Sequence, residues 1–188
     1  MSVKELSYTG KICLMGDGGN QNLRRKKKMT TKATRYALLM EECASYVREV
    51  KPSCNDPEKA AALLRPLMQQ WQDVGQETVW AIMLDIKMRA IGAPVEISRG
   101  TLDKCMIPAR DVMRAALMAN ANAIILVHNH PSGDPCPSAE DVNVTKTIMA
   151  AGDIIGVRVL DHIIIGTKTE INPGYISIRA AGLVSFKE

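Results

Sequence analysis

The sequence predicts an α/β fold in which helices cover both faces of a mixed sheet, giving α/β/α layers. Two observations support this fold class. Short apolar segments rich in β-branched residues alternate with longer segments whose apolar residues recur at helical spacing, and such alternation is typical of layered α/β proteins. The segment 123–127 is continuously apolar and β-branched-rich, as expected of a buried central strand.

Four helices are expected from the helical spacing of apolar residues. Their ranges are 34–50, 56–71, 109–120 and 138–150. The second has the strongest start signal, because Asp56 can cap it, Pro57 occupies its first position and Glu58 follows. Pro66 is expected to bend this helix, and Gly152 to end the last one. Residues 52–55 form a linker.

The strands are expected where β-branched and apolar residues are bounded by turn residues. Their ranges are 78–85, 90–98, 123–130, 157–160 with 163–165, and 175–178. The first two are expected to form a hairpin around residues 86–89. The segment 131–135, Pro-Ser-Gly-Asp-Pro, then ends the central strand in a tight turn.

The central strand and the helix after it carry the pattern H-x-H-x(7)-S-x(2)-D, made of His128, His130, Ser138 and Asp141. Side chains alternate along a strand, so two imidazoles at i and i+2 lie on the same face. Asp141 lies in the first turn of the next helix and faces back toward the strand end. Two nitrogens and one carboxylate oxygen can therefore converge on one divalent ion with an open coordination position, which distinguishes catalytic from structural zinc sites.

Each part of this pattern also has a simpler interpretation. Two histidines can lie on a solvated strand face, and Ser138-x-x-Asp141 alone is a capping box. Asp141 can serve both as a cap and as a ligand. Asp134, in the turn, fits equally as a group that orients a ligand histidine or as an Asx-turn residue. His162 is expected to be a hydrogen-bonded structural residue, because Asp141 already completes the ligand set.

The segment from about residue 56 to the C-terminus resembles the RadC-like proteins, a bacterial branch of the JAMM (MPN+) metalloprotease superfamily. The matching pieces occur in the family's order. They are Ser98-Arg99-Gly100-Thr101-Leu102, Pro108-Ala109-Arg110-Asp111, Asn120-Ala121, residues 128–134, Pro137-Ser138 with Asp141, and residues 161–166. The resemblance implies a JAMM/MPN-type, cytidine-deaminase-like fold for residues 56–188. The family's helix-hairpin-helix-like region has no clear match in residues 1–55.

The resemblance also implies roles for individual residues. His128, His130 and Asp141 would hold one zinc ion per chain, and Ser138 would donate a hydrogen bond to the developing oxyanion. Glu77, just before the first strand, stands where the family has the glutamate that accepts a proton from the metal-bound water. These roles imply a zinc-dependent hydrolase that cuts a peptide or isopeptide bond. They do not identify the substrate.

General chemistry is consistent with these roles. Zinc lowers the pKa of a bound water to about 7, and a general base contributes roughly 10²–10⁴ in rate. Glu140 is a rival for that base, although a glutamate at a helix start more often supports the helix dipole. A zinc deaminase is excluded, because the segment 128–130 lacks the H-x-E glutamate and Cys136 lacks a second cysteine at P-C-x-x-C spacing.

Composition indicates one globular domain with an extension. The chain has 188 residues, of which 46% are hydrophobic, enough for a real core. No segment has the apolar length of a membrane span, and no secretory signal is visible. The five cysteines are odd in number and never in C-x-x-C spacing. We therefore expect reduced thiols and a cytoplasmic protein.

Charge is concentrated at the N-terminus. Residues 1–56 contain 11 Lys/Arg and 6 Asp/Glu, whereas residues 57–188 contain 13 and 14. The basic run 24–28 indicates a disordered extension over residues 1–33, with nucleic-acid contact as the alternative. A second hypothesis, of a different class, is a DNA-associated accessory protein in DNA repair, recombination or mobile-element function, with the fold used for binding. Met29 follows the run and is an alternative translation start.

Overall fold

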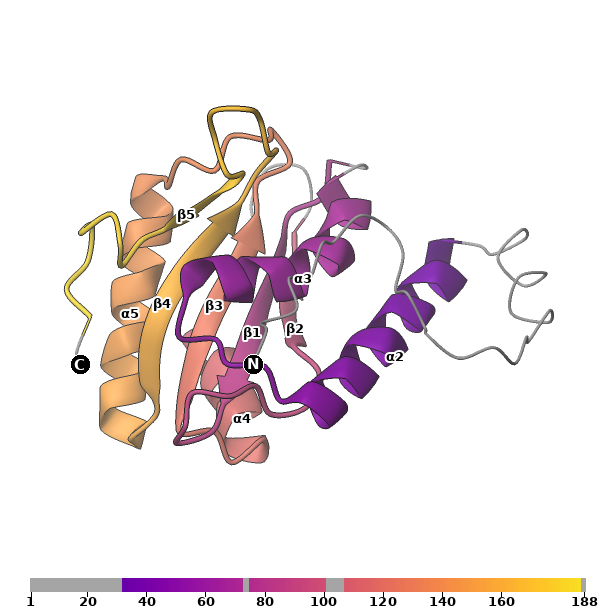
Figure 1. Ribbon diagram of the computed structural model, residues 1–188. Coiled ribbons are helices and arrows are strands. Elements are labelled where there is room, and N and C mark those ends of the chain that lie inside the picture. Colours follow the sequence, from indigo (N-terminus) through magenta and orange to yellow (C-terminus); the bar gives the residue numbers. More distant parts are fainter. Residues whose placement is uncertain (1–31, 73–74, 101–106, 187–188) are drawn as a thin grey trace, which may run out of the picture.

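The sheet has five strands in the order β2-β1-β3-β4-β5 (Figure 1). This computed structural model describes residues 32–72, 75–100 and 107–186. The strands are β1 Thr78–Leu84, β2 Val95–Arg99, β3 Ala123–Asn129, β4 Arg158–Ile165 and β5 Tyr175–Ser177. The pair β3–β4 is parallel and the other three pairs are antiparallel. The mixed sheet predicted from the sequence is therefore confirmed.

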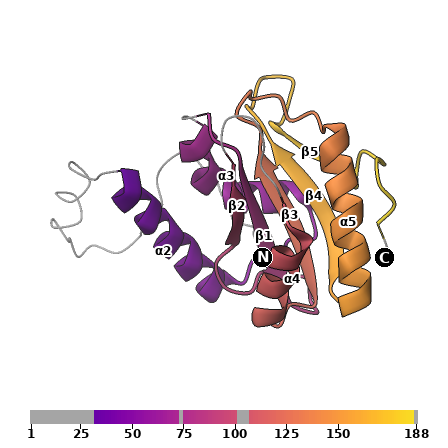
Figure 2. The same ribbon diagram turned by 180° about the vertical axis from the view of Figure 1, so that it is seen from behind.

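Helices cover both faces of this sheet. They are α2 Lys32–Val50, α3 Pro57–Gln72, α4 Ala109–Met118 and α5 Ala139–Ile155. Helix α3 lies over one face, and α4 and α5 lie over the other (Figures 1 and 2). Helix α2 packs beside α3 near β1 and β2, where Tyr36 contacts Trp80 and Glu96. The predicted α/β/α layers are confirmed. None of the described helices is long and apolar enough to cross a lipid bilayer.

The core is divided in two by the alternation of side chains along the strands. On one face, Trp80 and Val127 pack against Leu64 of α3. On the other face, Leu126 packs with Ile148 of α5. Burial of large apolar side chains on both faces is typical of a central strand in a layered fold, and β3 is buried along its whole length.

Residues 1–31 lie outside the described residues, so the prediction of a basic, disordered extension is not tested. Residues 32 and 33, which that prediction included, begin α2. The strand predicted at 90–98 is shorter than expected. Ala90 and Ile91 bond back to the end of β1, and β2 begins only at Val95. The interruption follows from Gly92, whose φ of +64° lies in the left-handed region.

The predicted end of α5 at Gly152 is wrong. The helix continues to Ile155 and ends at Gly156, whose φ of +83° makes it the C-terminal cap. Gly152 has a different reason to be glycine: a Cβ there would lie 2.3 Å from the carbonyl oxygen of Val157. It permits close packing of α5 against the segment that leads into β4. The two apolar segments expected around residues 157–165 form the single strand β4.

We predict that Gly152→Ala destabilises the fold. Alanine improves helix propensity by about 1 kcal/mol over glycine. The 2.3 Å approach is to main chain and cannot be relieved by a rotamer change, and overpacking of this kind typically costs about 1–3 kcal/mol or more. Urea unfolding measures the balance. An unchanged or increased free energy of unfolding would contradict the close-packing role.

Candidate metal centre

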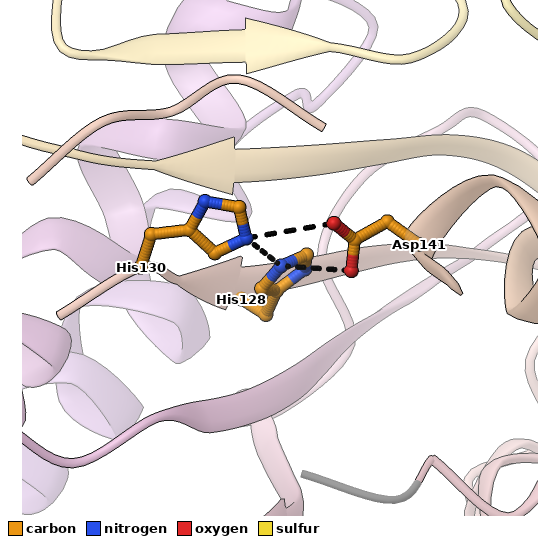
Figure 3. Close-up of side chains that lie close together, drawn as sticks. All are labelled: His128, His130 and Asp141. Atoms are coloured by element: carbon orange, nitrogen blue, oxygen red, sulfur yellow. Dashed lines mark hydrogen bonds and ion pairs between the residues drawn. The ribbon is translucent and has the colours of Figure 1, made fainter. Parts of the chain in front are cut away.

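His128, His130 and Asp141 lie together at the end of β3 (Figure 3). The two Nε2 atoms are 2.9 Å apart. The carboxylate of Asp141 lies 3.3 Å from Nε2 of His128 and 3.5 Å from Nε2 of His130. The three donor atoms lie within 4.8 Å of one another, which is a geometry that could hold a metal ion.

The turn after β3 delivers His130 to this group. The His130 amide donates to the Ile165 carbonyl and so extends pairing with β4 by one residue. The loop then packs against residues 166–167, because Thr167 donates to the Gly133 carbonyl. Gly166 is required at this contact, since a Cβ there would lie 2.3 Å from the same carbonyl oxygen. Packing of two loops, and not the strand alone, therefore places the second imidazole.

Asp141 reaches the histidines through the capping box of α5. The Ser138 hydroxyl accepts from the Asp141 amide, and the Ser138 amide donates to Asp141 Oδ2. Asp141 therefore completes the capping box and faces the two histidines in the same conformation. The Ser138 hydroxyl also donates to Asp141 Oδ2 at 2.7 Å. Its predicted donation to an oxyanion requires the hydroxyl hydrogen to turn away from this carboxylate.

The loop carbonyl of Asp134 sets the protonation of His130. Nδ1 of His130 lies 2.8 Å from this oxygen, which can only accept, so Nδ1 carries a hydrogen. Nε2 is then the ring nitrogen turned toward Asp141, where it can bind either a metal ion or a proton. The Asp134 carboxylate instead accepts from the Cys136 amide in an Asx turn. Both alternatives predicted for Asp134 are thus present, one on its main chain and one on its side chain.

A buried chain of hydrogen bonds sets the protonation of His128. The Thr145 hydroxyl donates to the Asp141 carbonyl at 2.6 Å, so it must accept from Nδ1 of His162, 2.6 Å away. Nε2 of His162 then accepts from Nδ1 of His128 at 2.8 Å. This order leaves Nε2 of His128 with a free lone pair. The expected structural, hydrogen-bonded role of His162 is confirmed, whereas Thr145 was not predicted.

The donor set therefore fits a cation. Two imidazole lone pairs, each fixed by a hydrogen bond at the opposite ring nitrogen, face each other beside a carboxylate. Such a set needs a metal ion or a proton between its members, and mixed imidazole and carboxylate ligands suit zinc. A hydrogen-bonded second ring nitrogen is the usual arrangement at histidine metal ligands.

The charges of the group favour the same conclusion. Burial, followed by the proximity of His162, holds the pKa of His128 well below its usual value. Burial opposes ionisation of Asp141, but its hydrogen bonds with His130 and Ser138 and its electrostatic interaction with His128 outweigh burial and lower the pKa of the carboxyl. Burial lowers the pKa of His130, but its hydrogen bonds with Asp141 and with the Asp134 carbonyl outweigh burial and raise it. The group thus holds a neutral buried imidazole, an imidazole that readily takes a proton and an ionised carboxylate, and a metal ion that binds there displaces this proton.

Glu77 precedes β1 and faces the same side of the sheet as the ligand histidines. The β1–β3 register pairs Val79 with His128, so its continuation sets Glu77 opposite His130. Partial burial, with the charge of Asp141, raises the pKa of Glu77, while His130 lowers it. The structure therefore places Glu77, the base expected from the sequence, close enough to His130 and Asp141 for their charges to shift its pKa. Its rival Glu140 is exposed in the first turn of α5.

We predict that His162→Leu lowers zinc affinity by about 10- to 100-fold, the usual effect of removing a group that orients a ligand histidine. Leucine leaves Nδ1–H of His128 without its acceptor. Competition with a zinc-sensitive dye measures the affinity. Thr145→Ser, which keeps the hydroxyl, serves as the matched control and should bind as the wild type does. Wild-type affinity in His162→Leu would show that this hydrogen bond does not orient the ligand.

Comparison with known proteins identifies the relatives of the chain. A family model described as RadC-like JAB domain matches residues 54–183. A UPF0758 protein of Desulforudis audaxviator is 42% identical over 118 residues, which are 63% of this chain and 50% of that protein. One from Caldanaerobacter subterraneus is 45% identical over 114 residues, 61% of this chain and 47% of that protein. One from Clostridium beijerinckii is 34% identical over 78% of this chain and 62% of that protein. The chain spans about half the length of the first two relatives.

Proposed function

The chain belongs to the RadC-like JAB domain family, and from this premise we propose that it is a zinc-dependent hydrolase acting on a peptide or isopeptide bond. One observation carries the proposal. His128, His130 and Asp141 converge with both imidazole Nε2 atoms directed at the same point as the carboxylate. A JAB-type fold with this ligand group is suited to metal-dependent hydrolysis.

Zinc held by these residues would polarise a substrate carbonyl and lower the pKa of a water molecule to about 7. We assign the proton transfers to Glu77. Its carboxylate accepts a proton from the attacking water and returns it to the leaving nitrogen. The raised pKa of Glu77 favours this role, because a general base or acid works best when its pKa lies near the operating pH. The Ser138 hydroxyl is the proposed donor to the oxyanion.

Two other zinc chemistries have less support. Two-metal phosphodiester hydrolysis needs a second ligand group about 3.5–4 Å away, and among the described residues one group of candidate ligands is found. Nucleobase deamination uses cysteine ligands; the group here has imidazole and carboxylate donors instead. Cleavage of an amide bond at a single metal centre is the reaction that the resemblance implies, and it uses every member of the group.

The test is a search for cleavage products. The zinc-loaded protein is incubated with a pooled peptide library and with lysine-branched isopeptides, and the products are identified by mass spectrometry. We expect cleavage that stops with a chelator and returns with added zinc. Stoichiometric zinc without cleavage of either pool would overturn the proposal. The alternative of a DNA-associated accessory protein rests on the basic run 24–28, which lies outside the described residues.

A further inference from the structure

Asn129 separates the two ligand histidines in sequence and lies on the opposite face of β3. Its side chain is fully buried. The carboxamide oxygen accepts from the amide of Thr78 at 2.9 Å and from its hydroxyl at 2.7 Å. The carboxamide nitrogen donates to the carbonyl of Gln76 at 3.0 Å. The two main-chain groups held by Asn129 are those on either side of Glu77.

We infer that Asn129 is a positioning residue, which holds Glu77 against the metal ligands by binding the main chain on both sides of it. The catalytic part of this inference rests on the proposed function, because it assumes that Glu77 transfers the proton. The structural part, that Asn129 fixes the position of Glu77, rests on the hydrogen bonds alone.

The main chain needs this support because regular pairing ends here. The last β1–β3 pair joins Val79 to His128, and the His130 amide is already bonded to Ile165 of β4. At and beyond this last pair, the Thr78 amide and the Gln76 carbonyl bond the side chain of Asn129. A carboxamide supplies one acceptor and one donor, as a peptide unit does, so asparagine can continue the ladder past its end.

A second contact fixes the other side of Glu77. The amide of Gly100 donates to the Glu77 carbonyl at 2.9 Å, and the Gln76 side chain donates to the Gly100 carbonyl at 3.1 Å. The segment around Glu77 is thus held between Asn129 on one side and Gly100 on the other. If Asn129 positions this segment, its loss must also loosen the Gly100 contact, which Asn129 does not touch.

Amide hydrogen exchange followed by NMR tests this consequence and needs neither substrate nor metal. In Asn129→Leu we expect the amides of Thr78 and Gly100 to exchange at least about tenfold faster, while those of the β3 core keep their protection. Asn129→Asp keeps the acceptor but loses the donor and should have a smaller effect at Thr78; it replaces the leucine variant if that one fails to fold. Ser177→Ala removes a buried hydroxyl at the other end of the sheet and should leave Gly100 unchanged.

Zinc binding and catalysis supply the second readout. Zinc stoichiometry should stay at one per chain in Asn129→Leu, because the residue faces away from the ligands. The kcat of Asn129→Leu should be lower than that of the wild type. The double variant Asn129→Leu/Glu77→Gln should have the same kcat as Glu77→Gln alone. Unchanged exchange at Gly100, or independent additive losses of kcat, would overturn the inference. If the wild type cleaves nothing, the proposed function fails, while the exchange measurement still decides whether Asn129 positions Glu77.

Discussion

Replacing His130 with alanine is expected to abolish zinc retention. The loss removes one of three ligands, so affinity should fall by far more than the roughly 100-fold that loss of a supporting group can cost. Plasma mass spectrometry after dialysis measures the metal content, which should drop from about one zinc per chain to none. His130 is suitable for this test because it is partly exposed, so alanine does not open the core as it would at fully buried His128.

Thermal unfolding gives an independent reading of the same variant. Zinc at 1,000 times its dissociation constant stabilises a protein by about 4 kcal/mol. For a domain of this size each kcal/mol shifts Tm by about 2–4 °C, so added zinc should raise the wild-type Tm by roughly 8–16 °C and leave His130→Ala unmoved. Cys136→Ser is the matched control, because this exposed thiol lies in the same loop; it should keep the metal. Zinc retained by His130→Ala would exclude the predicted ligand set.

Replacing Glu77 with glutamine should reduce kcat by roughly 10²–10⁴-fold, the usual contribution of a positioned general base. Glutamine preserves the size of the side chain and removes its ability to accept a proton. Zinc content and the free energy of unfolding should stay close to wild type, because Glu77 is not in the ligand group. Initial rates on the best substrate of the peptide search, with zinc measured on the same samples, check this expectation.

Glu140→Gln is the matched control for this variant. Glu140 is also close in sequence to the ligands, but it is exposed in the first turn of α5, where a carboxylate serves the helix dipole. We expect nearly wild-type activity. Full activity in Glu77→Gln together with loss in Glu140→Gln would move the base from the segment before β1 to α5. It would also remove the reason to expect an effect of Asn129 on catalysis.

Much of the candidate site could be predicted because its members are close in sequence. Two histidines at i and i+2 on a strand must share a face, and Ser138 with Asp141 form a capping box that needs only one helical turn. The structure places both as expected. Glu77 was assigned through the family resemblance, because a glutamate before a strand has no local feature that distinguishes a base from a solvated residue.

The supporting residues could not be predicted in the same way. Asn129 contacts main chain 51 and 53 residues earlier, and His128 contacts His162, 34 residues later. The expected end of α5 failed for a related reason. Gly152 and Gly156 look alike as helix stops, and only the approach of the Val157 carbonyl shows that one of them serves packing.

The sequence by itself determined the fold class, the family, the identity of the metal-ligand candidates and most element positions. Hydrophobic periodicity, caps and strand alternation depend on residues within a few positions of one another, so they can be recognised in the chain. Only the tertiary structure decided which imidazole nitrogen faces the candidate metal position, and that the side chain of Asn129 binds the main chain on both sides of Glu77. Those features are hydrogen bonds between distant segments, and they exist only once packing of the sheet has brought β1, β3, β4 and α5 together.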